Sequence, residues 1–217
     1  MWLWKWESFP MMKPNESPNR QRQWSGALAR AEGDRWEQEV QANFNCYFRF
    51  RIASLALMPV PTKPTMTNGK FVRITCGTAP FDIYGFTMAQ CKGWKTGTFV
   101  GCELKHSHEH HTAMQIGDSG TIKPHQLMAL YEVACAGGIG RILWKNGGVI
   151  GLLKEDGVMK AYHEYMAAIK SRGEDGRKSI PWDSFEQIGY QSVEGNSVVA
   201  WLPVLPPQAV LRTSLRS

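Results

Sequence analysis

Three charged residues in the middle of the chain have the types and spacing that metal-assisted hydrolysis requires. Residues 100–105 read as a β-strand, in which alternation places Glu103 and Lys105 on one face and Leu104 on the other. Upstream, Asp82 stands alone between apolar residues, where a charge is costly without a partner such as a metal ion. Close carboxylates bind a hard cation, Mg²⁺ or Mn²⁺, and a neighbouring amine positions water and offsets charge during phosphodiester hydrolysis.

The pairing of these residues depends on a predicted hairpin. A strand that turns at Gly85 and returns through Gly93 to Thr98 would place Asp82 beside Glu103, so that both acids share one cation. An ordinary exposed ion pair would also explain a glutamate and a lysine two residues apart on a strand. The solitary aspartate upstream favours the metal site.

Three helices are expected around this centre. The first runs from Arg35 after a cap at Gly33-Asp34, with an apolar stripe at helical spacing. The second begins at Pro124 and stops at Gly137-Gly138, because proline favours the first turn and glycine the end. The third covers residues 158–169.

Short β-rich segments lie between the helices and read as a sheet that is antiparallel at first. Three prolines between positions 59 and 64 exclude a central strand there and predict an exposed excursion. The order of elements predicts an α/β or α+β sandwich around a mixed sheet. The expected strands are residues 71–75, 81–84, 98–105, 139–144 and 149–153.

The composition favours one soluble domain with a polyanionic partner. A chain of 217 residues with 43% hydrophobic content supports one substantial core, and its formal net charge is +6. Nucleic acid is the leading partner and an anionic membrane surface the second. No apolar run approaches a membrane span and no signal peptide is evident, so an unexported protein is expected. The five cysteines form no C-x-x-C pair, which is typical of ordinary thiols in a reducing cytoplasm.

Together these motifs resemble a known nuclease signature. Pro80-x-Asp82 followed by Glu103-x-Lys105 resembles the PD-(D/E)XK nuclease superfamily. Four further features, in the same order, resemble its RecU-like Holliday junction resolvase branch. They are the helix Gly33-Asp34-Arg35-Trp36-Glu37, the Pro-x-Pro-x-Lys stretch from Pro59 to Lys63, the helix start His125-Gln126, and the segment from Gly176 to Pro181.

The resemblance implies a fold, a substrate and an assembly. The fold would be α/β with a restriction-endonuclease-like core, in which helices flank a mixed central sheet and a stalk protrudes at about residues 57–78. A flexible arm (1–28) would precede the nuclease domain (29–190), and a C-terminal extension (191–217) would follow. A homodimer would act on DNA, most simply on two-fold symmetric four-way junctions. The setting would be a bacterial or phage-encoded protein in the nucleoid-associated cytoplasm.

The resemblance also implies roles for individual residues. Asp82 and Glu103 would ligate Mg²⁺ or Mn²⁺, and Lys105 would orient the attacking water. Glu37 would join the edge of the site or a second metal ion, although a solvated helix acid is an equal alternative. Gln126 would hydrogen-bond a substrate phosphate or Lys105, unless it is a plain surface glutamine.

Several basic residues are candidate phosphate contacts, although solvated surface charges would explain them too. They are Lys63, Lys123, His125, Arg177 and Lys178. A histidine-rich segment at 106–111 admits a zinc site, but its spacing lacks complete ligand pairs, and a partly protonated loop near DNA is the simpler interpretation. The alternatives to a junction resolvase are a general, phage or defence nuclease with the same core and a non-catalytic DNA-binding module.

Overall fold

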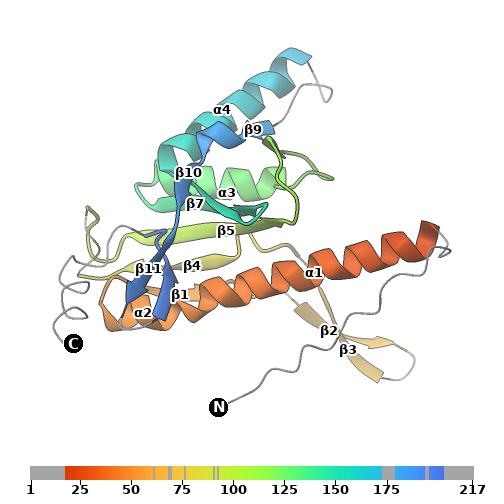
Figure 1. Ribbon diagram of the computed structural model, residues 1–217, viewed down its shortest axis with the longest axis horizontal. Helices are drawn as coiled ribbons and strands as arrows, with labels where there is room; N and C mark the ends of the chain where they lie inside the picture. Colours follow the sequence, from red (N-terminus) through yellow and green to blue (C-terminus); the bar gives the residue numbers. More distant parts are fainter. Residues whose placement is uncertain are drawn as a thin grey trace.

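A mixed six-stranded sheet forms the centre of the protein (Figure 1). The computed structural model describes residues 18–60, 62–67, 70–75, 77–89, 91, 93–172, 179–193 and 196–202. Strands β5 and β7 pair in parallel, and every other neighbouring pair in this sheet is antiparallel. The strand order is β1 (Ala53–Leu57), β4 (Ile83–Thr87), β5 (Phe99–Ser107), β7 (Ile139–Asn146), β8 (Val149–Leu153) and β10 (Glu186–Ile188).

Helices cover both faces of the sheet, which confirms the predicted α/β class with a mixed central sheet (Figure 1). On one face, α1 (Pro18–Ala42) and α2 (Phe44–Arg49) pack over a core that includes Trp36 and Leu104. On the other, α3 (Pro124–Cys135) and α4 (Glu155–Arg172) pack over a core that includes Leu127 and Trp144. Helix α3 is the crossover that joins the parallel strands β5 and β7, as parallel pairing requires.

Two of the three predicted helices are confirmed, whereas the predicted start of the first is wrong. Helix α3 has the predicted start and ends just before the Gly137-Gly138 stop, and the third predicted helix lies within α4, so both predictions are confirmed. The predicted cap at Gly33-Asp34 is wrong, because α1 begins at Pro18 and passes through both residues. A single glycine lowers helix propensity but does not end a helix whose apolar face is packed.

Glycines occur in the sheet in two settings, in the turn between β7 and β8 and in the interior of β4. The β7–β8 hairpin turns through Gly147 (φ 58°) and Gly148 (φ 86°), the positive angles that a two-residue turn of type I′ requires. The expected turn at Gly85 is wrong, because Gly85 lies inside β4. A Cβ there would come within 2.0 Å of the Ser54 carbonyl oxygen. The chain reverses beyond β4, and the predicted antiparallel pairing with β5 is formed.

The proline-bearing excursion forms a separate two-stranded sheet. Strands β2 (Thr62–Thr67) and β3 (Lys70–Thr75) pair with each other and not with the central sheet. Figure 1 shows this hairpin projecting beyond α1. At its base, the Met58 amide donates to the Asp82 carbonyl oxygen at 2.7 Å. The hairpin therefore leaves the body next to Asp82.

The C-terminal part of the described chain completes the core. Two further small sheets pair β6 (Ala113–Gln115) with β9 (Ser179–Pro181) and β11 (Tyr190–Val193) with β12 (Asn196–Val199). Val199, Trp201 and Leu202 are buried against α1 and α2 residues, so the packed body extends past position 190. Within the described residues, no helix combines the length and apolar character needed to cross a membrane.

Candidate active site

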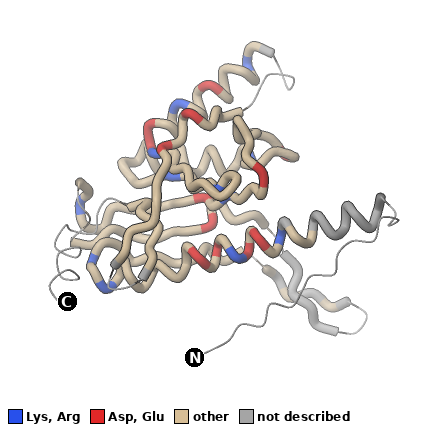
Figure 2. The backbone as a smooth tube through the Cα atoms, in the orientation of Figure 1, with Lys and Arg blue, Asp and Glu red and all other residues tan. Residues whose placement is uncertain are grey.

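One pocket brings together all five residues that the sequence nominates for catalysis. It has a volume of about 220 Å³ and lies where α1, the start of α3 and the second half of β5 meet. Figure 2 shows acidic positions of α1 close to acidic positions of the central strands. Its lining includes Glu37, Asp82, Glu103, Lys105 and Gln126.

Asp82 is tied to the neighbouring strand by two hydrogen bonds. Its amide donates to the Cys102 carbonyl oxygen at 3.1 Å, and its Oδ2 accepts from the Leu104 amide at 2.8 Å. These bonds hold the carboxylate at the level of Glu103, the residue between the two partners. The carboxylate of Asp82 also lines the pocket.

Glu103 is a fully buried carboxylate with an incomplete set of partners. Its Oε1 lies 2.5 Å from Lys105 Nζ and 2.5 Å from Gln126 Nε2. Its Oε2 is buried and has no hydrogen-bond partner among the described residues. Burial, and secondarily the charge of Asp82, raises the pKa of Glu103 to about 8. The site is therefore short of positive charge when both acids are ionised.

Gln126 links the active-site strand to the start of α3. Its Oε1 accepts from the Lys123 amide at 3.1 Å and from Lys105 Nζ at 3.3 Å, while its Nε2 donates to Glu103. The first of these bonds belongs to a capping box, which satisfies an otherwise free backbone group at the helix start. Of the roles that the sequence suggested for Gln126, the structure shows the hydrogen bond to Lys105.

Glu37 approaches the same pocket from α1. Its side chain is partly buried, and burial, then the charges of Asp82 and Asp34, raise its pKa above the ordinary value. Glu37 lines the pocket together with Asp82 and Glu103, and its role there stays a prediction.

The donor set fits a hard divalent cation. Two carboxylates present oxygen atoms to one space, and the unpartnered Oε2 of Glu103 needs a positive partner. Among the described residues, no three His, Cys, Asp or Glu side chains gather closely enough to enclose a metal ion alone. Mg²⁺ is commonly held by one or two carboxylates together with water and substrate phosphates, so Asp82 and Glu103 suffice as its protein ligands.

No known family model matches this chain, and no curated protein shows significant similarity to it. The chemistry of the pocket therefore has to be inferred from its own residues and geometry.

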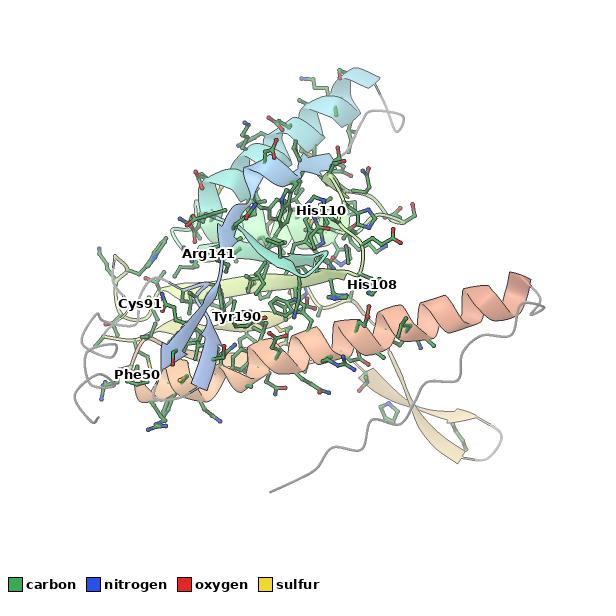
Figure 3. The ribbon with its side chains drawn as sticks, in the orientation of Figure 1. Phe50, Cys91, His108, His110, Arg141 and Tyr190 are labelled. Carbon is green, nitrogen blue, oxygen red and sulfur yellow. The ribbon has the colours of Figure 1, made fainter. Side chains whose placement is uncertain are left out.

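The four clustered histidines point to different partners. His106 lines the pocket, and burial lowers its pKa. His108 Nδ1 lies 3.1 Å from Glu32 of α1, whereas His110 packs edge-on against Trp182 of the short helix η2 (Trp182–Ser184) (Figure 3). His111 exchanges two 2.8 Å hydrogen bonds with Asn146 through its backbone. In the described part of the chain, this arrangement gives no support to the zinc alternative.

The candidate DNA contacts are only partly described. Lys123 lies beside the pocket at the start of α3, where its ammonium donates to the Asp118 carbonyl oxygen. His125 is half-buried in the first turn of α3. Lys63 belongs to β2, but its side chain lies outside the described residues, as do Arg177 and Lys178 entirely. These contacts stay predictions.

A second group of charged residues beside the site was not found from the sequence. Lys145 Nζ lies 2.8 Å from Glu39 Oε2 and 5.0 Å from the centre of the Trp36 ring, and Tyr190 donates to the other oxygen of Glu39. Lys145 is the parallel-strand partner of His106, so the pairing of β5 with β7 was the signal that would have revealed it.

A larger hollow of about 720 Å³ lies near the start of β5 and the end of α3. Its charged lining residues are Lys95 and Glu132, both exposed, and no pair of buried acids borders it. The smaller pocket has the convergent ionisable groups with shifted pKa values that mark a reactive site.

Proposed function

We propose that this protein is a metal-dependent DNA endonuclease with a PD-(D/E)XK active site on a restriction-endonuclease-like core. The observation that supports this most is the buried carboxylate of Glu103, which has one unpartnered oxygen, Lys105 at 2.5 Å, and Asp82 immediately before the adjoining strand β4. Structural ion pairs seldom leave a buried carboxylate oxygen without a partner. A site that binds a cation and a phosphate leaves such an oxygen without a partner until these ligands bind.

Each residue has a separate task in this proposal. Asp82 and Glu103 would hold Mg²⁺ or Mn²⁺, which supplies Lewis-acid activation of a phosphodiester and of water when bound. Lys105 orients the attacking water and offsets the charge that develops on the phosphate. Gln126 keeps both Glu103 and Lys105 in place through its three hydrogen bonds. Glu37 adds a carboxylate at the edge of the pocket for a water molecule or a second cation.

The substrate in this proposal is a four-way DNA junction, which a homodimer would resolve by paired nicks. The chain carries net charge +6, which favours a polyanion. The β2–β3 hairpin leaves the body beside Asp82, so an element able to enter a branched substrate lies next to the predicted cutting site. Two-fold symmetric junctions are most simply served by two symmetric active sites.

A comparison of DNA substrates tests the proposal. The protein is incubated with Mn²⁺ and a mobile four-way junction, linear duplex or single strand, as wild type, Lys105→Met and Lys160→Met. Lys160 is the control, because its exposed side chain lies on α4 at 3.9 Å from Glu164. We expect symmetric nicks on the junction, with a rate about 100-fold lower in Lys105→Met and unchanged in Lys160→Met.

The other outcomes are equally clear. Cleavage of all three substrates would replace the junction resolvase with a general nuclease of the same core. Binding without Mn²⁺-dependent cleavage by the wild type would contradict the catalytic proposal and leave a DNA-binding module. Equal rates for the two lysine variants would remove Lys105 from the mechanism.

A further inference from the structure

Gly33 occupies a position where the fold itself gives no reason for glycine. It lies in the interior of the 25-residue helix α1, where glycine is the least favourable residue apart from proline. Its φ is not among the positive values, so the backbone does not require glycine. A Cβ built at Gly33 meets no described atom within 4 Å, so packing does not require it either.

Gly157, in contrast, is a glycine that close packing requires. Gly157 lies in α4, and a Cβ there would come within 2.6 Å of the Leu153 side chain. Only open space faces Gly33. Glycine in such a position allows another molecule to approach the backbone closely.

The open space at Gly33 borders the candidate active site. Gly33 lines the same pocket as Glu37, Asp82 and Glu103. Residues three and four apart share one face of a helix, so Gly33, Trp36 and Glu37 form one side of this pocket. A side chain at position 33 would therefore occupy space beside Asp82 and Glu103.

Two unpartnered polar atoms lie on the neighbouring face of the same helix, at positions four residues apart. Glu32 Oε2 and Trp36 Nε1 are buried and have no hydrogen-bond partner among the described residues, and Trp36 is only 2% exposed. Both residues line an adjoining pocket of about 120 Å³, which shares Trp36 and His106 with the first pocket. One atom accepts a hydrogen bond and the other donates one.

The chemistry of this pair indicates the ligand. The second pocket is lined by two acids, Glu32 and Glu39, and by two bases, Arg35 and Lys145, so its formal charges balance and it has no excess of positive charge for a phosphate. A nucleobase offers a donor and an acceptor side by side on one edge and carries no charge. The second pocket therefore suits an unpaired base better than a phosphate.

We propose that a nucleic-acid strand crosses α1 at Gly33, with its sugar-phosphate backbone over the missing side chain and an unpaired base at Glu32 and Trp36. The scissile phosphate would then lie in the first pocket, a placement that rests on the proposed function. The crossing at Gly33 requires only that the protein binds a nucleic-acid strand, and not that it cleaves one. Gly33 thus determines which substrates reach the site.

The test adds bulk at Gly33 and, as a control, places leucine at an exposed position on another face of the same helix. Gly33→Ala and Gly33→Leu are compared with Gln38→Leu, because Gln38 is exposed on α1 and does not line either pocket. Three properties are measured: the melting temperature without metal or DNA, Mn²⁺ binding by calorimetry, and binding of a junction and of a single strand in Ca²⁺. Single-turnover cleavage in Mn²⁺ is recorded in parallel.

The expected signature separates stability from binding. Gly33→Ala should raise the melting temperature by about 2–4 °C, because alanine favours the helix. Gly33→Leu should be at least as stable as the wild type, yet bind DNA at least tenfold more weakly, with Gly33→Ala between them. Mn²⁺ affinity should stay within twofold, because Gly33 provides no ligand. Gln38→Leu should match the wild type in DNA binding.

Two results would overturn the crossing: DNA binding by Gly33→Leu at the wild-type affinity, or a loss of stability in Gly33→Leu that accompanies its loss of binding. A wild type that binds DNA without cleaving it, while Gly33→Leu loses binding, would refute the endonuclease and support the crossing. A wild type that binds no nucleic acid would refute both.

Discussion

At the scale of single residues, the buried carboxylate of Glu103 determines how the site responds to protons and cations. The side chain has an exposed fraction of 0%, and its two partners, Lys105 and Gln126, both bind the same oxygen. Burial raises its pKa to about 8. A proton and a divalent cation therefore compete for the same buried charge, and metal affinity should increase as the pH rises.

The raised pKa of Glu103 also predicts how the stability of the protein changes with pH in the absence of metal. The folded protein retains a proton on Glu103 that the unfolded chain loses above its ordinary pKa near 4.5, so stability falls as the pH rises from about 5 to 8. Glu103→Gln should flatten that fall, giving a higher melting temperature than the wild type at pH 8 and a similar one at pH 5. Thermal denaturation in a chelator measures both.

A matched variant keeps this test specific. Glu132→Gln removes an exposed carboxylate on α3 and should leave the pH profile of the wild type unchanged. Added Mn²⁺ should raise the melting temperature of the wild type most at high pH and have little effect on Glu103→Gln. Equal pH profiles for wild type and Glu103→Gln would show that Glu103 ionises normally.

The residues of the site differ in how far the sequence predicts them. Asp82, Glu103 and Lys105 could be nominated because a charge inside an apolar strand is visible from its neighbours in the chain. Their convergence required only one antiparallel hairpin. Lys145 could not be nominated, because its partners Glu39 and Trp36 lie on α1, more than 100 positions away in the chain, and ordinary lysines far outnumber such pairs.

At the scale of elements, the position of α1 decides whether Glu37 reaches the pocket. Glu39 joins the helix to two sheets, because it binds Lys145 of β7 and the hydroxyl group of Tyr190 on β11. Burial, then the bond to Glu39, raises the pKa of Tyr190, so its hydroxyl remains a donor. Because Glu39 follows Glu37 by two residues, this contact fixes the helix near its active-site residue.

The contact predicts coupled losses of stability. Glu39→Gln should destabilise the protein by about 1–2 kcal/mol, since the partly buried Lys145 loses its charged partner. Tyr190→Phe keeps the ring and removes one hydrogen bond, which should cost about 0.5–1.5 kcal/mol. The double variant should lose less than the sum, because both changes act on the single cluster formed by Glu39, Lys145 and Tyr190. Urea denaturation of the four proteins gives the coupling, and strictly additive losses would contradict it.

Elements with strong local signals were predicted well, and those that depend on distant partners were not. Helix α3 has proline in its first turn and glycines after its end, so its bounds follow from backbone chemistry alone. The start of α1 does not, because its first half lacks an apolar period. Strands β6, β9, β11 and β12 each pair with a single partner in two-stranded sheets, and their sequences of three or four residues are too short to show an alternation.

At the scale of the whole molecule, the β2–β3 hairpin forms a sheet separate from the central sheet. Its two strands pair only with each other, and the chain enters and leaves it where the Met58 amide binds the Asp82 carbonyl oxygen. Neither of the two buried cores includes a described residue of this hairpin. The described side chains of the two strands, Thr62, Pro64 and Met66, are exposed and add nothing to the packing of these cores.

This separation predicts a variant that keeps the chemistry and loses the choice of substrate. Replacing residues 60–77 with a short Gly-Ser turn should leave the melting temperature nearly unchanged, since the bond at the base already holds the two ends together. Mn²⁺-dependent nicking should persist on DNA with single-stranded segments, while the preference for four-way junctions over duplex falls at least tenfold. Substrate competition assays at fixed salt measure the ratio, because phosphate contacts make every affinity depend on ionic strength. A variant that still selects junctions would assign the recognition to the body of the protein, and one that loses all cleavage while remaining folded would show that the hairpin helps to position Asp82.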